Sequence, residues 1–324
     1  MSHKATQMRA AVLAAPGQIR LERVALPEPG EGMVRVRLEG SGVCGSNLPP
    51  WEGRSWFEYP FQAGAPGHEG WGEIDAVGPK VSKVSIGERV ALLSYNAYAE
   101  YDVANENAVV RLPSALAKKP FPGEPLACAV NVFRRCQIGP GQTVAIVGAG
   151  FLGALLTQLV SEAGAKVLAI SRRAFALEMA RACGAVETLD SANRERVLER
   201  VRAVTSGHGC DCVIEAAGQQ ETLELASELT RERGRLVIAG YHQDGPRQIN
   251  LQLWNWRGLD VINAHERDPK VYVDGMQAAV ELTSQGRLEP FPLFTHTLRL
   301  DELGKAFTLM QERPEKFLKA LVFT

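Results

Sequence analysis

The distribution of hydrophobic positions divides the chain into two parts that meet near Leu126. In the first part, from about residue 8 to residue 110, short apolar stretches alternate with clusters of glycine and proline. Short stretches bounded by turn-forming residues are typical of β-strands. We therefore predict an irregular, mostly-β unit whose strands include residues 9–13, 33–38, 72–77 and 89–93.

The second part, from Leu126 to about His265, alternates strand-like and helix-like stretches. This alternation predicts an α/β architecture, in which the strands of a doubly wound parallel sheet are joined by crossover helices. The predicted strands cover residues 143–147, 166–171, 213–216 and 235–239, and the predicted helices cover residues 152–162, 174–183 and 220–229.

The end of the chain predicts a return to the first unit. Helical patterns over residues 271–284 and 301–311 precede an apolar stretch at residues 318–323, which predicts a final strand. Such a strand can pair with the sheet of the first unit. We therefore predict a mostly-β domain over residues 1–124, an inserted α/β domain over residues 125–268, and a return to the first domain over residues 269–324.

Composition is typical of an ordinary globular protein and excludes several classes of partner. Apolar residues make up 45% of the chain, charged residues 23%, and the net charge is −1. Because no block of basic residues occurs, no nucleic-acid partner is expected. The apolar runs are too short to span a membrane and no secretory signal core follows the N-terminus, so we expect a cytoplasmic protein.

The six cysteines do not form a recognisable framework. None belongs to a Cys-x-x-Cys pair, so neither a disulfide scaffold nor a structural zinc knuckle is indicated. Cys210 and Cys212 lie beside and within an apolar stretch, and we expect both to be core thiols.

A glycine-rich loop follows the strand predicted at residues 143–147. A G-x-G-x-x-G pattern between an apolar strand and a helix is typical of dinucleotide binding, because its glycines allow a tight turn and a close approach of the pyrophosphate. The helix start then offers free N–H groups to the phosphates. The predicted cofactor-binding residues here are Gly148, Gly150, Phe151, Leu152 and Gly153.

The end of the next strand distinguishes the two nicotinamide cofactors. An NAD site usually has Asp or Glu there to accept from the ribose 2′-hydroxyl. This chain instead has Ser171, Arg172 and Arg173. A hydroxyl and two guanidinium groups suit a 2′-phosphate, so we predict NADP rather than NAD.

Two further motifs lie in the first part and at its border. Cys44 is within the run Gly42–Asn47, and a second run places His68 and Glu69 between glycines. With these motifs the chain resembles the zinc-containing medium-chain dehydrogenase/reductase family, and within it the sorbitol and related polyol dehydrogenases. The resemblance covers nearly the whole chain from Met8, and it includes the residues Gly67, Gly72, Gly78, Glu124, Pro125 and Leu126, followed by Phe133, Arg134 and Arg135.

The resemblance implies a GroES-like catalytic domain completed by the C-terminal segment, a Rossmann domain, and one catalytic zinc. It implies Cys44, His68 and Glu124 as zinc ligands, with Glu69 beside the metal as a direct or water-linked ligand. Ser46 matches the family's hydroxyl that contacts the substrate alcohol and begins proton relay. The implied reaction moves a hydride between a secondary alcohol or polyol and the cofactor, in a homodimer or homotetramer.

The chain departs from the family pattern at two places. Asn47 stands where the family usually has Asp, which keeps hydrogen bonding but removes a charge near the metal. No cysteine lies between Cys44 and Cys128, so we expect no structural zinc. Cys128 is an alternative third ligand, although the Glu-Pro-Leu match favours Glu124. Lys319 corresponds to a basic residue that family members often have near the metal.

Two other functions stay open at this stage. Zinc-free relatives reduce quinones or enones with NADPH, but they generally lack the Cys and His-Glu motifs. A non-catalytic nucleotide-binding protein is the other alternative, for which Asn47 is the one sequence indication.

Overall fold

The protein is described by a computed structural model that covers residues 6–324. The chain divides into two compact units, of which the first comprises the chain up to Ala127, Arg267–Ser284 and Phe294–Thr324. The second comprises Cys128–Glu266 and Gln285–Leu293. The predicted domain boundaries place residues 285–293 in the first domain. Their contacts are with the second unit, because Glu289 donates from its backbone N–H to Gln158 Oε1 (2.7 Å).

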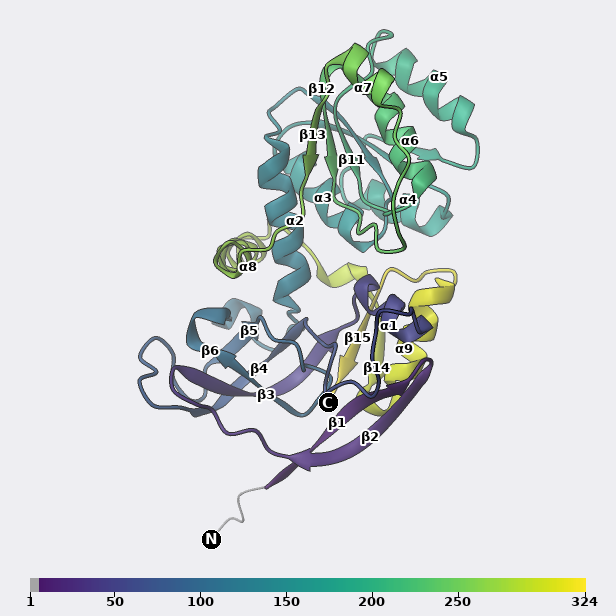
Figure 1. The fold of residues 1–324 in the computed structure, drawn as a ribbon. Helices are drawn as coiled ribbons and strands as arrows, with labels where there is room; N and C mark the ends of the chain where they lie inside the picture. The colour runs from purple at the N-terminus through teal and green to yellow at the C-terminus, as the bar shows by residue number, and fades with distance from the viewer. Residues whose placement is uncertain (1–5) are drawn as a thin grey trace. The chain divides into compact units, whose positions relative to one another are not determined.

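The first unit is built on a seven-stranded sheet in the order β14-β15-β3-β4-β5-β7, with β6 also paired to β3. A separate antiparallel pair is formed by β1 and β2. The final strand pairs antiparallel with β3, so the C-terminal segment completes the sheet of the first unit as predicted (Figure 1). The strands are β1 (Gln7–Ala15), β2 (Gln18–Ala25), β3 (Met33–Gly42), β4 (Gly70–Val77), β5 (Arg89–Leu92), β6 (Tyr101–Asn105), β7 (Val109–Arg111), β14 (Phe294–Arg299) and β15 (Lys319–Phe323).

Short helices and 3-10 turns connect these strands. The α-helices are α1 (Leu48–Glu52), α8 (Pro269–Ser284) and α9 (Leu303–Glu312), and the 3-10 turns are η1 (Gly45–Asn47), η2 (Glu106–Ala108), η3 (Ser114–Leu116) and η5 (Leu300–Glu302). Helix α2 (Gly123–Cys136) begins in the first unit and continues in the second, and the 3-10 turn η4 (Phe291–Leu293) belongs to the second. Across residues 6–324, every helix is too short or too polar to cross a membrane.

Apolar side chains of β3 and β4 contribute to the core of the first unit. Alternate residues of β3, Val34 and Val36, are fully buried against Ile74 of β4. A second cluster packs Phe307 of α9 against Tyr98 and Val322. Burying apolar side chains of this size stabilises the fold by about 1.5–3 kcal/mol each. The second cluster also contains Val43, the residue before Cys44, and so packs beside the end of β3.

The second unit is the predicted α/β domain. Its six strands form a parallel sheet in the order β10-β9-β8-β11-β12-β13. The central strand β8 is almost entirely buried, as expected for a strand covered on both faces. The elements are β8 (Thr143–Val147), α3 (Phe151–Glu162), β9 (Lys166–Ser171), α4 (Ala174–Ala182), β10 (Glu187–Asp190), α5 (Arg194–Val204), β11 (Cys210–Glu215), α6 (Gln220–Leu229), β12 (Thr230–Ile238), α7 (Leu251–Arg257) and β13 (Asp260–Asn263).

Two edge strands of this sheet were not predicted from the sequence. Both β10 and β13 are four residues long and none of their residues is fully buried. Short polar edge strands carry little of the hydrophobic pattern from which strands are recognised. Inside the sheet, Cys210 and Cys212 are buried in β11, as expected for core thiols.

Candidate functional site

Three of the predicted metal-site residues converge where β3 ends and β4 begins. Cys44 follows β3 and precedes the 3-10 turn η1, whereas His68 and Glu69 lead directly into β4. Antiparallel pairing of β3 with β4 brings these two positions to the same end of the sheet. The ligand atoms of Cys44, His68 and Glu69 all lie within 4.8 Å of one another.

The imidazole of His68 is oriented for a metal by its own backbone neighbourhood. Nδ1 lies 2.9 Å from the carbonyl oxygen of Pro66, and it therefore carries the proton and donates. Once Nε2 loses its proton, its lone pair gives the arrangement of a metal-ligating histidine. The hydroxyl of Ser46 lies 3.5 Å from Nε2.

The charges around His68 favour a cation. Burial lowers the pKa of His68, but Cys44 and then the carboxylates of Glu124 and Glu69 raise it, and the result is a pKa of about 10. Without a metal, the ring would thus hold a proton among negative groups. A divalent cation replaces that proton when it binds.

Glu69 is neutralised by a lysine from the far end of the chain. Lys319 on β15 has its Nζ 2.6 Å from the carboxylate and donates to Oε1. Neither side chain is appreciably exposed. The second oxygen of Glu69, Oε2, is buried and also lies 2.6 Å from the Nζ atom of Lys319. A Cβ on Gly42 would come within 1.8 Å of this oxygen, so only glycine fits there.

Glu124 lies near the group without belonging to it. It occupies the first turn of α2 and is partly buried. Its negative charge raises the pKa of His68, which places it in the same electrostatic environment. Among residues 6–324, the group with mutually close ligand atoms consists of Cys44, His68 and Glu69, and it includes neither Glu124 nor Cys128.

Asn47 connects the two segments that carry the ligands. Its Oδ1 accepts from the backbone N–H of Cys44 (3.4 Å) and from the hydroxyl of Tyr98 (2.7 Å). Its Nδ2 donates to Pro66 O (3.2 Å), the carbonyl that also orients His68. Burial raises the pKa of Tyr98 well above its usual value, so its hydroxyl remains a donor. No motif in the sequence indicates Tyr98.

The donor set fits zinc. A thiolate, an imidazole nitrogen and carboxylate oxygens are the ligands that zinc takes in catalytic sites. The imidazole of His68, whose Nδ1 donates to the carbonyl of Pro66, can offer Nε2 to a cation once that nitrogen loses its proton. These residues can therefore hold the metal that the sequence predicts.

The glycine loop of the second unit has the geometry of a dinucleotide site. Gly148 has φ +107°, and a Cβ there would lie 2.9 Å from backbone atoms of Ala216 and Ala217. A Cβ on Gly153 would lie 2.0 Å from the carbonyl oxygen of Gly148. Glycine is therefore required at both positions. Gly150 is the N-cap of α3, whose first turn contains Phe151 and Leu152, both partly buried.

The predicted phosphate-binding residues lie at the end of β9. Arg172 is exposed, and Arg173 is partly buried. The Nη2 atom of Arg173 is 4.0 Å from the Cβ position of Gly150, so this guanidinium faces the glycine loop. Ser171 Oγ accepts from the backbone N–H of Arg173 (3.3 Å).

Two protein-family models match different parts of the chain. Residues 30–114 match the model of an alcohol dehydrogenase GroES-like domain, and residues 152–281 match that of a zinc-binding dehydrogenase. Sorbitol dehydrogenase of Bacillus subtilis strain 168 is 24% identical, with 100% of this chain and 99% of that protein aligned. Erythritol/L-threitol dehydrogenase of Mycolicibacterium smegmatis is 26% identical, with 98% of each aligned.

A solved structure gives the same picture. A protein of Sinorhizobium meliloti 1021, described as a zinc-binding dehydrogenase bound to NADP, superposes with a TM-score of 0.86 at 26% identity. The alignment covers 99% of this chain and 100% of that protein.

Proposed function

The chain belongs to the zinc-binding medium-chain dehydrogenase family as an NAD(P)-dependent alcohol or polyol dehydrogenase, and we propose that it interconverts a secondary alcohol or polyol with the matching ketone. The convergence of Cys44, His68 and Glu69 within 4.8 Å carries the proposal. Zinc-free reduction of quinones or enones does not require a cysteine, a histidine and a glutamate clustered in this way.

The proposed zinc ligands are Cys44, His68 and Glu124, and Glu69 stands beside them. Lys319 already neutralises Glu69, which weakens its carboxylate as a permanent ligand. Glu124 acts on His68 through its negative charge, which raises the pKa of the ring. Three protein ligands leave one position for the substrate, as in other catalytic zinc sites.

The chain's own residues orient the substrate and move its proton. When bound, zinc supplies Lewis acidity at the substrate oxygen, and the nicotinamide supplies or accepts the hydride. Ser46 lies beside His68 Nε2 and is partly exposed, so its hydroxyl can accept the alcohol proton and pass it to solvent. Glu69 adds a negative charge beside His68, and Lys319 balances this charge.

NADP is the proposed cofactor. The end of β9 has no carboxylate for a ribose 2′-hydroxyl, and Arg173 faces the middle glycine of the loop. Arg172 is exposed and free to turn toward a 2′-phosphate. The NADP bound to the Sinorhizobium meliloti protein is consistent with this preference.

A homodimer or homotetramer is the proposed assembly. Strand β13 is an edge of the parallel sheet, and its residue Val261 is 37% exposed. Trp256 of the adjacent helix α7 is 81% exposed. An edge strand with exposed apolar neighbours is suited to pairing with a second copy.

Metal dependence of turnover tests the proposed reaction. We expect oxidation of secondary alcohols or polyols with NADP, abolished by chelation, restored by zinc, and lost in Cys44→Ser. Cys183→Ser is the matched control, because Cys183 is also partly buried but lies on the second unit. Reduction of quinones or enones that survives chelation, or no turnover on any alcohol, would overturn the proposal.

A further inference from the structure

A buried polar cluster lies at the carboxyl end of β11, outside the candidate metal site. In the strand order β10-β9-β8-β11-β12-β13, successive connections run one way from β8 and the other way from β11. Ligands of open α/β sheets bind at the carboxyl ends of strands at such a reversal. Glu215 is the last residue of β11, directly beside Val147, which precedes the glycine loop.

The carboxylate of Glu215 gathers donors from two connections. Its Oε1 accepts from the backbone N–H groups of Ala217 and Gly218 (both 2.8 Å) and from Thr222 Oγ1 (2.7 Å). These bonds close the turn after β11. Its Oε2 lies 3.0 Å from Nε2 of His242, on the segment after β12.

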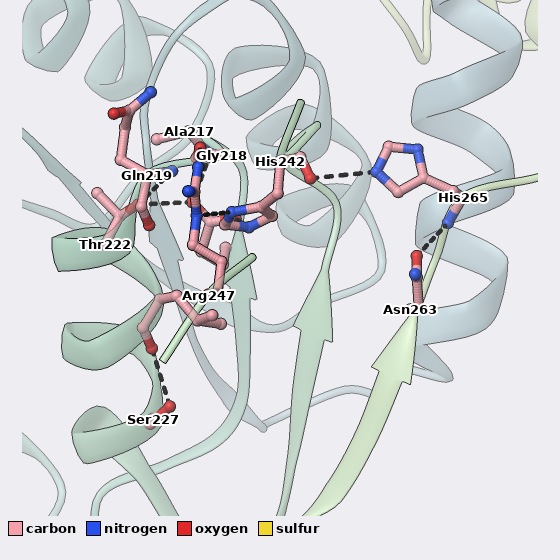
Figure 2. Close-up of polar contacts among 12 residues, drawn as sticks. Ala217, Gly218, Gln219, Thr222, Ser227, His242, Arg247, Asn263 and His265 are labelled. Atoms are coloured by element: carbon pink, nitrogen blue, oxygen red, sulfur yellow. Dashed lines mark hydrogen bonds and ion pairs between the residues drawn. The ribbon is translucent and has the colours of Figure 1, made fainter. Parts of the chain in front are cut away.

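Arg247 holds the other side of His242 (Figure 2). Its Nε donates to His242 Nδ1 (2.8 Å), so Nδ1 carries no proton and Nε2 is the donor to Glu215. Another nitrogen of Arg247 donates to the carbonyl of Gly218 (2.9 Å), and the guanidinium also pairs with Asp244. The three side chains thus form a hydrogen-bonded series in which the guanidinium donates to the imidazole and the imidazole donates to the carboxylate.

The carboxylate of this hydrogen-bonded series is buried, and the imidazole is partly buried. The side chain of Glu215 is 0% exposed, and that of His242 is 14% exposed. Burial raises the pKa of Glu215, but the hydrogen bonds from His242, Thr222 and the backbone outweigh it and lower the pKa, so the carboxylate is charged. An interior ionised group of this kind is costly unless its bonds are complete, and here each oxygen has a donor.

The segment after β12 has a second anchor. Nε2 of His265 donates to the carbonyl of Gly240 (3.1 Å), and Figure 2 shows His265 reaching this segment from β13's side. A Cβ on Gly240 would lie 2.3 Å from the backbone nitrogen of Gly218. The segment after β12 and the turn after β11 therefore pack directly on each other.

The same turn touches the glycine loop. The Cβ position of Gly148 is 2.9 Å from backbone atoms of Ala216 and Ala217, the first residues of the turn. Because of this contact, a shift of the turn would displace Gly148, the first glycine of the dinucleotide motif. Arg247 contacts His242, His242 contacts Glu215, and Glu215 bonds the turn that contacts Gly148.

We propose that Glu215, His242 and Arg247 are positioning residues for the dinucleotide, which hold the turn at residues 216–219 and the segment at residues 239–247 against the glycine loop. The inference rests on NAD(P) binding by the second unit. It assigns to His242 one donor and one acceptor, and it assigns to Arg247 an indirect role in cofactor affinity.

Two substitutions at His242 separate positioning from bulk stability. Gln carries one amide donor and one amide acceptor, so His242→Gln can keep both bonds, whereas His242→Ala loses both. We expect the Kd of NADPH, followed by nicotinamide fluorescence, to rise about tenfold in His242→Ala and in Arg247→Ala. We expect it to stay near the wild-type value in His242→Gln. In turnover, the KM for the cofactor rises with little change in kcat.

Arg257→Ala is the matched control. Arg257 is also partly buried and donates to backbone carbonyls, those of Glu228 and Thr230, at the opposite end of the sheet. It is expected to lower the melting temperature without changing cofactor affinity. Unchanged affinity in folded His242→Ala and Arg247→Ala, or equal losses in Arg257→Ala, would overturn the inference. Failure of the wild-type protein to bind either cofactor would instead overturn the proposed function.

Discussion

Glu69 and Lys319, 250 positions apart in the chain, form a buried ion pair beside the candidate zinc ligands. The pair joins the start of β4 to the start of β15 and so ties the returning C-terminal segment to the site. Both carboxylate oxygens of Glu69 lie 2.6 Å from the Nζ atom of Lys319. Lys319 therefore balances the charge of a buried carboxylate that lies beside the candidate zinc ligands.

Removing the lysine is expected to destabilise the metal-free protein. Lys319→Met leaves the buried carboxylate of Glu69 uncompensated, which costs about 3–5 kcal/mol. The double variant with Glu69→Gln should regain most of this loss. Urea unfolding of the zinc-free protein measures both. Lys305→Met, on the surface, is the control and should change little, since exposed pairs contribute about 0–1 kcal/mol. Equal losses in the single and double variants would contradict the account.

Asn47 is expected to govern zinc affinity although it is not a ligand. Asn47→Ala removes the bonds to Cys44 N–H and to the Pro66 carbonyl, and residues that orient ligands typically contribute 10–100-fold in metal affinity. Tyr98→Phe removes one donor to Asn47 and should cost less. Competition with a chromophoric chelator gives the affinity, and Asn255→Ala on α7 is the control. An unchanged zinc affinity in Asn47→Ala would show that the hydrogen bonds of Asn47 do not orient the zinc ligands.

The arginines after β9 are expected to set cofactor preference. Replacing Arg172 and Arg173 with Ala should weaken NADPH binding about tenfold or more, because charge-assisted bonds to the 2′-phosphate are lost. NADH, which lacks that phosphate, should be affected much less. Arg181→Ala on α4 is the matched control, and kcat/KM with each cofactor is the measurement. Equal use of NADH and NADPH by the wild-type protein would argue against the prediction.

Glu215 is expected to make stability depend on acid pH. Although burial raises its pKa, the stronger effect of its hydrogen bonds lowers the pKa in the folded state. The stabilisation is therefore fully present above the unfolded pKa of about 4.3 and is lost as pH falls through the lower folded value. The free energy of unfolding should differ most between the wild type and Glu215→Gln at neutral pH, and the difference should shrink below about pH 4. A constant difference across this range would refute the prediction.

Features that follow from local sterics were predictable from the sequence. The glycine loop is an example, because Gly148 and Gly153 are required by the turn between β8 and α3, whose spacing is visible in the sequence. Cys44 and His68 were identified through a family resemblance, and antiparallel pairing of β3 with β4 explains why they meet.

Features that depend on distant parts of the chain were harder to predict. Lys319 was carried over only as a basic residue near the metal, and its pairing with Glu69 required knowledge of how β15 returns to β3. The cluster of Glu215, His242 and Arg247 was missed altogether. Glu215 ends β11, whereas His242 and Arg247 follow β12. No sequence motif indicates that the segments after these two strands pack against each other.

X-ray absorption at the zinc edge of the purified protein tests the central claim most directly. We expect one zinc per chain with a single sulfur ligand at about 2.3 Å and nitrogen or oxygen ligands at about 2.0–2.2 Å. The sulfur contribution should vanish in Cys44→Ser. A protein without zinc, or a zinc surrounded by sulfur alone, would contradict the account.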